Sequence, residues 1–275
     1  MIRDLAWGLY WRARAIVLLY RGASWRERGA LTAYAARELA AQVPLLSGRI
    51  PRAAWIRLGG FDVLVALGRY ELGGYMDVWL RRLYERAPGF QSRSGWTVVD
   101  VGANVGFFTL RQVALGARAV ALEPNREARG RFGSTIERNG LSPRVRLLPF
   151  AAGRSDGVAQ LAVGTATVTG TILATPDARE RFAVEVRTLD SLLEAERRVD
   201  LLKIDTEGAE VEVLAGAAST LRRTGRVVLE WHSPALRAAA RTLLAEGGFD
   251  VVGSDGAIDY YRKADDVSTS GSTPG

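Results

Sequence analysis

The sequence contains no cysteine, which excludes disulfide bonds and thiolate metal centres together. It has one histidine, His232, and only two lysines, Lys203 and Lys263, so arginine supplies nearly all of its positive charge. No apolar run reaches the roughly 20 residues that a membrane-spanning helix requires. Arg12 and Arg14 interrupt what would be the apolar core of a secretion signal. We therefore expect neither a cleaved signal nor a spanning segment, and we predict a cytoplasmic protein.

The positive charge is concentrated at the N-terminal end of the chain. Residues 1–58 hold ten arginines against three acidic residues, which accounts for the whole net charge of +7 and leaves residues 59–275 balanced. Tryptophans lie among these arginines, and a helix of that composition can attach to an anionic membrane surface. The sequence thus leaves open a peripheral contact of residues 1–30 with the inner face of a membrane. The interpretation that we favour is a cap whose aromatic side chains pack on the main domain.

The first 90 residues are predicted to form a basic extension ahead of the main domain. Periodicity and turn signals indicate, in order, helices at 2–20 and 31–42, a β-hairpin at 54–67 with Gly59-Gly60 at its turn, and a helix at 76–87. We divide the chain into this extension (1–90), a main domain (91–265) and a tail (266–275) whose composition predicts disorder.

From residue 97 onward, apolar strand-like runs alternate with helical segments, which predicts an α/β fold with a mostly parallel sheet. The expected strands are 97–101, 118–122, 145–149, 200–204, 226–229, 249–252 and 258–261. The last two form an antiparallel pair at the edge of a Rossmann-like, seven-stranded sheet. Residues 151–187 break this rhythm and predict an inserted hairpin with a mobile loop at 164–176. One continuous helix is expected over residues 211–221, on the spacing of its apolar residues.

Residues 97–110 predict a buried strand, a tight turn and the beginning of a helix. Gly102 and Gly106 are placed where the backbone must turn sharply and approach a ligand. The free N–H groups of the following helix point back at that turn. Such a loop suits a ligand that resembles a nucleotide, without specifying which one.

An acidic residue at the end of the second strand narrows the choice of ligand. Glu123 follows Gly102 by about 20 residues, the distance at which a carboxylate can accept hydrogen bonds from both ribose hydroxyls. Dinucleotide oxidoreductases and S-adenosylmethionine methyltransferases share this feature. Asn104 stands where a dinucleotide fingerprint has glycine, and no third glycine follows. Methyltransferase is favoured, since Asp100 could then attract a methionine amino group.

More ionisable residues follow the fourth and fifth strands, where ligands of open parallel sheets bind. His232 has an ordinary pKa near neutrality and could act as a general base, or it could be structural. Asp205 is the competing base, and its alternative role is to cap the next helix. Glu207 and Glu210 could merely complement that helix's dipole. A divalent cation could use Asp205, Glu207 and Glu230, with His232 a less favoured ligand, but without adjacent acids at these ends we assign no metal site.

Four segments together resemble the FkbM family of class I S-adenosylmethionine-dependent methyltransferases. They are V-D-V-G-A-N-V-G-F-F-T-L (99–110), L-E-P-N (122–125), L-K-I-D-T-E-G-A-E-V (202–211) and V-L-E-W-H (228–232). The resemblance covers roughly residues 61–261 and leaves the first 50 residues outside it. It implies methylation of a hydroxyl on a saccharide, a lipid-linked glycan or a secondary metabolite.

The resemblance also assigns roles to particular residues. It implies that the cofactor is held by Asp100, Gly102, Ala103, Asn104, Gly106, Glu123, Pro124, Asn125 and Ala151. The predicted catalytic residues are Asp205, Glu207 and His232. The predicted acceptor-binding residues are Tyr70 and Glu71, from a Tyr-Glu element ahead of the glycine loop, and Glu230.

Two other functions remain open at this point: a nicotinamide-dependent oxidoreductase, and a module that binds S-adenosylmethionine without turning it over. We expect no nucleic-acid partner. Enzymes that methylate nucleic-acid amines would be expected to carry an Asn/Asp-Pro-Pro-aromatic run after the fourth strand, where this chain has D-T-E-G (205–208).

Overall fold

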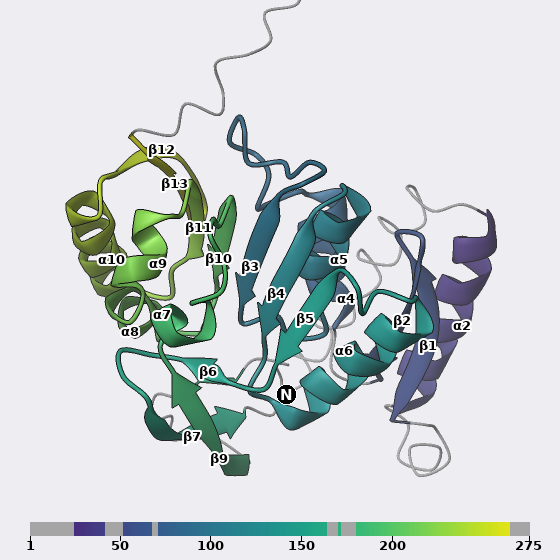
Figure 1. Ribbon diagram of the computed structural model, residues 1–275. Coiled ribbons are helices and arrows are strands. Elements are labelled where there is room, and N and C mark those ends of the chain that lie inside the picture. Colours follow the sequence, from purple (N-terminus) through teal and green to yellow (C-terminus); the bar gives the residue numbers. More distant parts are fainter. Residues whose placement is uncertain (1–24, 42–51, 68–70, 164–169, 172–179, 265–275) are drawn as a thin grey trace, which may run out of the picture.

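The computed structural model describes residues 25–41, 52–67, 71–163, 170–171 and 180–264. Its centre is a seven-stranded sheet in the order β12-β13-β11-β10-β3-β4-β5 (Figure 1). The strands are β3 (Thr97–Val101), β4 (Arg118–Leu122), β5 (Val145–Leu148), β10 (Leu201–Ile204), β11 (Arg226–Glu230), β12 (Phe249–Asp255) and β13 (Ile258–Lys263). β13 pairs antiparallel with β11 and β12, and the other pairs are parallel. The predicted Rossmann-like α/β fold is confirmed.

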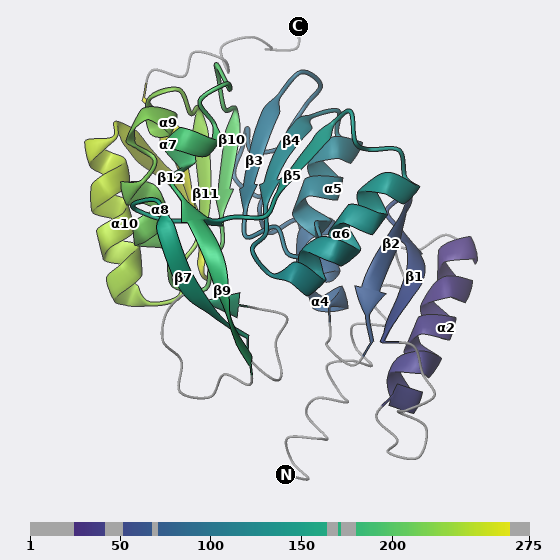
Figure 2. The same cartoon turned by 60° about the horizontal axis from the view of Figure 1, so that its bottom comes forward.

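Helices cover both faces of this sheet, so its strands are continuous apolar runs (Figure 2). On one face, Val98 of β3 packs in a cluster with residues of α5 (Phe107–Ala114) and α6 (Arg126–Arg138). On the other, Val99 packs with residues of α8 (Glu210–Ala215), α9 (Ala218–Arg222) and α10 (Pro234–Glu246). Alternate residues of one strand thus supply two separate cores, which fixes the pairing register.

The N-terminal extension docks beside α6 through a hairpin of β1 (Ala53–Leu58) and β2 (Phe61–Ala66). The hairpin lies between α6 and α2 (Trp25–Ala41), as Figure 1 shows. Asn139 fastens it, because the Asn139 side chain accepts from the Asp62 N–H and donates to the Asp62 carbonyl. The predicted hairpin is confirmed, and the helix predicted at 31–42 is the latter part of a longer α2. The helix predicted at 2–20 and the tail lie outside the described residues.

The helix predicted at 76–87 is wrong in its second half. The helical segments are α4 (Leu72–Tyr75) and the π-helical η1 (Met76–Leu80), which ends before Pro88 by several residues. Arg82 has φ of 53°, a left-handed conformation that stops the helix. The irregular chain beyond it carries Tyr84 to the carboxyl ends of β10 and β11, where its hydroxyl contacts Asp205 and Glu230.

The single helix predicted over 211–221 is also wrong, because the chain breaks between α8 and α9. Gly216 lies at the break, and a Cβ there would approach the Gly153 carbonyl oxygen to 2.0 Å. The helix is therefore interrupted where the backbone of the insert, at Gly153, packs against it. Ala218, expected on the apolar face, is exposed, and Val213 and Ala217 are buried instead.

The insert forms a small second sheet beside the carboxyl ends of the main strands (Figure 1). β7 (Gly157–Val163) and β9 (Glu180–Arg187) form the predicted antiparallel pair, and β6 (Ala151–Ala152) and β8 (Gly170–Thr171) extend it in the order β6-β9-β7-β8. Only residues 170–171 of the loop predicted at 164–176 are described, so its predicted mobility is untested.

Side-chain caps set the beginnings of three helices. Thr188 accepts from the Ser191 N–H at the start of α7 (Leu189–Leu192), and Ser233 accepts from the Leu236 N–H ahead of α10. Asn125 caps α6 in the same way. Within the described part of the chain, none of the helices combines the length and apolar composition needed to cross a bilayer.

Asp259 is expected to be a main support of the edge of the sheet. It is buried on β13 and accepts hydrogen bonds from Arg237 and Arg241 of α10 and from Ser254. Burial alone would raise the pKa of Asp259, but these partners hold it well below its usual range. Asp259→Asn should lower the free energy of unfolding by about 2 kcal/mol in chemical denaturation near pH 7.

Because the folded-state pKa is lowered, the stabilisation by Asp259 is complete above the unfolded-state pKa of about 4. It should disappear as the pH falls from there through the folded-state value. Asp250→Asn, at an exposed position on the neighbouring β12, is the control and should change stability little. Equal stability of Asp259→Asn and wild type at pH 7 would contradict this role.

Candidate active site

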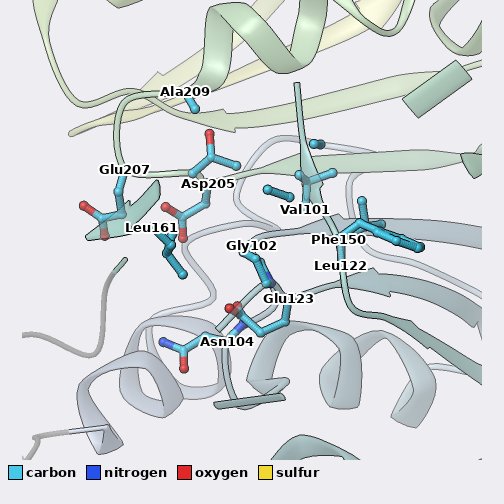
Figure 3. A pocket seen from close by; sticks show the side chains of 14 residues that line it. Val101, Gly102, Asn104, Leu122, Glu123, Phe150, Leu161, Asp205, Glu207 and Ala209 are labelled. Carbon is cyan, nitrogen blue, oxygen red and sulfur yellow. The ribbon is translucent and has the colours of Figure 1, made fainter. Parts of the chain in front are cut away.

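A cavity lies at the carboxyl ends of β3, β4 and β10, where the parallel sheet was expected to bind its ligand (Figure 3). Its lining residues are Val101, Gly102, Asn104, Leu122, Glu123, Pro124, Phe150, Ala151, Ala152, Leu161, Asp205, Thr206, Glu207 and Ala209. In Figure 3, Glu207 and Phe150 lie at opposite ends of this space. One end is therefore acidic and the other apolar.

The glycine loop after β3 is shaped by close contact with the chain after β10. Gly102 has φ of +80°, and a Cβ there would lie 1.9 Å from the Asp205 carbonyl oxygen. Gly106, with φ of +87°, is equally crowded, by the Phe132 ring. The Gly102 and Ala103 N–H groups both donate to the Leu122 carbonyl. Gly106 and Ala103 thus shape the loop without lining the cavity.

Glu123 faces the cavity and is held by backbone donors on both oxygens. The Asn104 N–H donates to Oε2 at 2.6 Å and the Asn125 N–H donates to Oε1 at 2.7 Å. Burial raises the pKa of Glu123 to about 7, although these hydrogen bonds oppose the shift. Each carboxylate oxygen keeps a lone pair for a ligand hydroxyl. The side-chain oxygen of Asn104, also a lining residue, is buried and has no hydrogen-bond partner among the described residues.

Lys203 is a residue of the candidate site that the sequence did not indicate. Its ammonium lies 3.2 Å from Asp100 Oδ1 and 3.4 Å from Asp205 Oδ2, and it donates to the Gly102 carbonyl at 2.8 Å. Burial alone would lower the pKa of Lys203, but the two carboxylates hold it above its usual value. The sequence feature that could have indicated its role is a single lysine inside an otherwise apolar strand. Asp100, bonded also by Thr109, is fully buried behind the loop, so direct contact with a methionine amino group is not supported.

The predicted catalytic residues come together at the acidic end. His232 Nε2 lies 3.3 Å from Glu207 Oε2 and 3.9 Å from Asp205 Oδ1, and Nδ1 lies 2.9 Å from Glu210 Oε1. Burial alone would lower the pKa of His232, but the Glu210 hydrogen bond and the neighbouring carboxylates raise it to about 9. A histidine that is already protonated at neutral pH does not suit the role of general base.

The alternative role of Asp205 as a helix cap is wrong. The residue ahead of α8 is Ala209, and no side chain caps that helix. Glu210, which could have served only the helix dipole, is instead the hydrogen-bond partner of His232.

Tyr84 is a second residue that the sequence analysis missed. Its hydroxyl donates to Glu230 Oε2 at 2.6 Å and lies 3.5 Å from Asp205 Oδ2. Burial and the charge of Asp205 raise the pKa of Glu230 to about 7. Tyr84 was not predicted as a site residue because its segment was expected to form part of the helix at 76–87. Glu230, predicted to bind the acceptor, thus lies beside Asp205 without lining the cavity itself.

The other predicted residues divide between the cavity and the scaffold. Pro124 and Ala151 line the cavity, and Asn125 caps α6. Glu71 is buried away from the cavity, where it accepts from the Ala66 N–H and pairs with Arg131, so a role in acceptor binding is not supported. Tyr70 lies outside the described residues.

The sheet topology, the glycine loop and the acidic strand ends define a Rossmann-like methyltransferase. More particularly, the family model described as "Methyltransferase FkbM domain" matches residues 100–251. The chain therefore belongs to the FkbM methyltransferase family, and the resemblance inferred from its motifs is confirmed.

The individual proteins that this chain resembles share less than a third of their residues with it. Methyltransferase sdnD of Sordaria araneosa is 27% identical over 191 residues, which are 56% of this chain and 73% of that protein. The AMB antimetabolite synthetase AmbE of Pseudomonas aeruginosa is 29% identical over 227 residues, which are 64% of this chain and 10% of AmbE. The crystal structure of methyltransferase FkbM from Methylobacillus flagellatus KT matches with a TM-score of 0.48 and 15% identity, over 94% of this chain and 60% of that one.

Gly102 is expected to be indispensable to the geometry of the site. Gly102→Ala should lower the free energy of unfolding by at least about 2 kcal/mol, because its Cβ meets a backbone oxygen and its φ is positive. Gly130→Ala, in α6 with open space around it, should raise stability by up to about 1 kcal/mol. Chemical denaturation measures both. Similar effects of the two substitutions would refute the crowding at Gly102.

Proposed function

We propose that this methyltransferase transfers the methyl group of S-adenosylmethionine to a hydroxyl group of a saccharide, a lipid-linked glycan or a secondary metabolite. The observation that carries the proposal is the buried Glu123 carboxylate, which two backbone N–H groups aim into the cavity beside the glycine loop. The class of reaction follows from the family, whereas the hydroxyl acceptor is what the resemblance implies, and the carboxylates of the acidic end support it.

The residues of the cavity suit the parts of S-adenosylmethionine. Glu123 would accept hydrogen bonds from the ribose hydroxyls, and the apolar end around Leu122 and Phe150 would cover the adenine. The unpartnered oxygen of Asn104 offers an acceptor to a methionine ammonium. When bound, the cofactor supplies a methyl group on a positively charged sulfur, a charge that the nearby carboxylates favour.

The chain's own contribution to the reaction would be positioning and proton removal. Methyl transfer is an in-line displacement, so the acceptor oxygen must be held against the methyl group. A hydroxyl also has to lose its proton. We assign that loss to the Asp205 carboxylate, which faces the cavity and is fixed by Lys203 on its other side. Glu207, at the same end, would orient the acceptor.

The alternatives are weaker in this structure. A dinucleotide needs backbone to cradle a pyrophosphate, and Asn104 with φ of 52° occupies the position of the required glycine.

The name of AmbE, an antimetabolite synthetase, is consistent with a metabolite acceptor. The cytoplasmic location, the membrane contact of residues 1–30, the absence of a nucleic-acid partner and the division at residues 90 and 265 stay predictions.

Binding of S-adenosylmethionine is the first test. Calorimetric titration should show binding to wild type, and Glu123→Gln should weaken it at least about tenfold, because an amide offers one acceptor oxygen where the carboxylate offers two. With the Glu123 pKa at about 7, affinity should fall by up to about tenfold per pH unit below 7, as protonation removes the acceptor. The variant should lack that slope. Glu137→Gln, exposed on α6, is the control. Binding of NAD in place of S-adenosylmethionine would sink the proposal.

Turnover is the second test. With a panel of saccharide and metabolite hydroxyls, Asp205→Asn should lower kcat by about 100-fold or more and change cofactor affinity little. Asp250→Asn should behave as wild type. Retained kcat in Asp205→Asn would remove Asp205 from the reaction, and tight binding without turnover of any acceptor would favour the non-catalytic module.

A further inference from the structure

Three potential metal ligands meet beside the acidic end of the cavity, on two neighbouring strand ends, and of these Asp205 and Glu207 line the cavity. One carboxylate oxygen each from Asp205 and Glu207 and a ring nitrogen of His232 all lie within 4.8 Å of one another. Ligand atoms around a single first-row or magnesium ion are roughly 3–4 Å apart, given coordination distances of about 2.0–2.2 Å. Small side-chain rotations would therefore close these atoms around one ion.

The orientation of the His232 ring is fixed by a carboxylate on the side away from Asp205 and Glu207. Glu210, with 0% exposure, contacts Nδ1 at 2.9 Å and also accepts from the Gly208 N–H at 2.8 Å. A carboxylate on one ring nitrogen is the arrangement that holds a metal-ligating histidine and directs the other nitrogen at the ion. Here the other nitrogen, Nε2, faces Asp205 and Glu207. The second Glu210 oxygen is buried and has no hydrogen-bond partner among the described residues.

The charges around this cluster are unbalanced. Asp205, Glu207, Glu210 and Glu230 bring four carboxylates together, and in the described part of the chain the only side-chain cations in salt-bridge contact with them are Lys203 and His232. Lys203 is already shared with Asp100. An additional cation would therefore be attracted to this end of the cavity.

We propose that Asp205, Glu207 and His232 bind a divalent cation of the Mn²⁺ or Mg²⁺ class at the acidic end of the cavity. The two carboxylates suit Mn²⁺ and Mg²⁺, and the imidazole, which would release its proton when the ion binds, favours Mn²⁺. Three protein ligands leave coordination positions open for water or a substrate oxygen. No metal site was assigned from the sequence alone, because these acids are not adjacent. Glu207 reaches Asp205 because residue 207 takes a left-handed φ of 54°.

The cation would give the site a means of activating the acceptor. An acceptor hydroxyl bound to it would have a lowered pKa and a fixed orientation toward the cavity. This consequence rests on the proposed methyl transfer, whereas binding of the cation does not. Asp205 would bind the ion through one carboxylate oxygen and would still take the hydroxyl proton on the other.

The test is a direct titration of the full chain, freed of metal with a chelator, with Mn²⁺ alone. The electron paramagnetic resonance signal of free Mn²⁺ should reveal one site per chain in wild type. Glu207→Gln and His232→Ala should each weaken binding at least tenfold, and Glu210→Gln should weaken it about tenfold through the orientation of His232. Glu212→Gln, on the same helix but paired with Arg154 at the surface, is the matched control and should bind as wild type.

Loss of binding in the three variants with an unchanged control would establish the site. Equal affinity in wild type, Glu207→Gln and Glu210→Gln would overturn it, and so would the absence of a wild-type site. Circular dichroism identifies any variant that does not fold, and Glu210→Gln keeps the side-chain shape if His232→Ala fails. Neither cofactor nor acceptor is present in this titration. A failed methyl-transfer assay would therefore leave its result standing.

Discussion

The ammonium group of Lys203 joins the two strand ends on which the site is built. Lys203 is 3% exposed, and a buried charge of this kind is tolerated only with close counter-charges. Asp100 supplies one from β3, and Asp205 supplies the other from the end of β10. The same ammonium donates to the Gly102 carbonyl. The glycine loop and the Asp205 carboxylate are therefore held at a fixed separation by one side chain.

Two aromatic rings pack beside this charge, Tyr84 from the extension and Phe108 from α5. The rings of Tyr84 and Phe108 lie 5.8 Å and 6.0 Å from Lys203 Nζ, where they exclude water. Tyr84 also donates to Glu230, which stands on the next strand. A residue from the segment predicted as an extension thus contacts two acids of the candidate active site. Removing the first 90 residues would take part of the site with them.

The central sheet, the glycine loop and Glu123 could be predicted from the sequence because each has a local signature. Buried parallel strands are continuous apolar runs, and Gly102 stands where a Cβ cannot fit. Lys203 and Asp100 have no such signature as a pair. They face each other because β10 and β3 pair in a register that places residue 203 opposite residue 100, about a hundred residues away in the sequence. That register emerges only when the sheet is assembled.

Other differences arose where tertiary contacts outweighed local periodicity. The apolar spacing of 211–221 is helical, yet the approach of Gly153 to Gly216 divides the helix. Glu71 stands in a family motif, but its burial with Arg131 and the Ala66 N–H determines its role here. A motif identifies residue types, and the surrounding packing decides whether they face a ligand or the scaffold.

Attraction of a positively charged cofactor does not by itself explain the excess of carboxylates at the acidic end. A sulfonium carries its full positive charge in the ground state, and this charge disperses as the methyl group is transferred. Negative groups beside it therefore stabilise the ground state more than the transition state, which by itself slows the reaction. Asp205 and Glu207 would offset that effect by acting on the acceptor, through proton removal or a bound cation. Neutralising Glu207 would therefore not speed methyl transfer, although it would remove a charge that stabilises the ground state, because the same charge also acts on the acceptor oxygen.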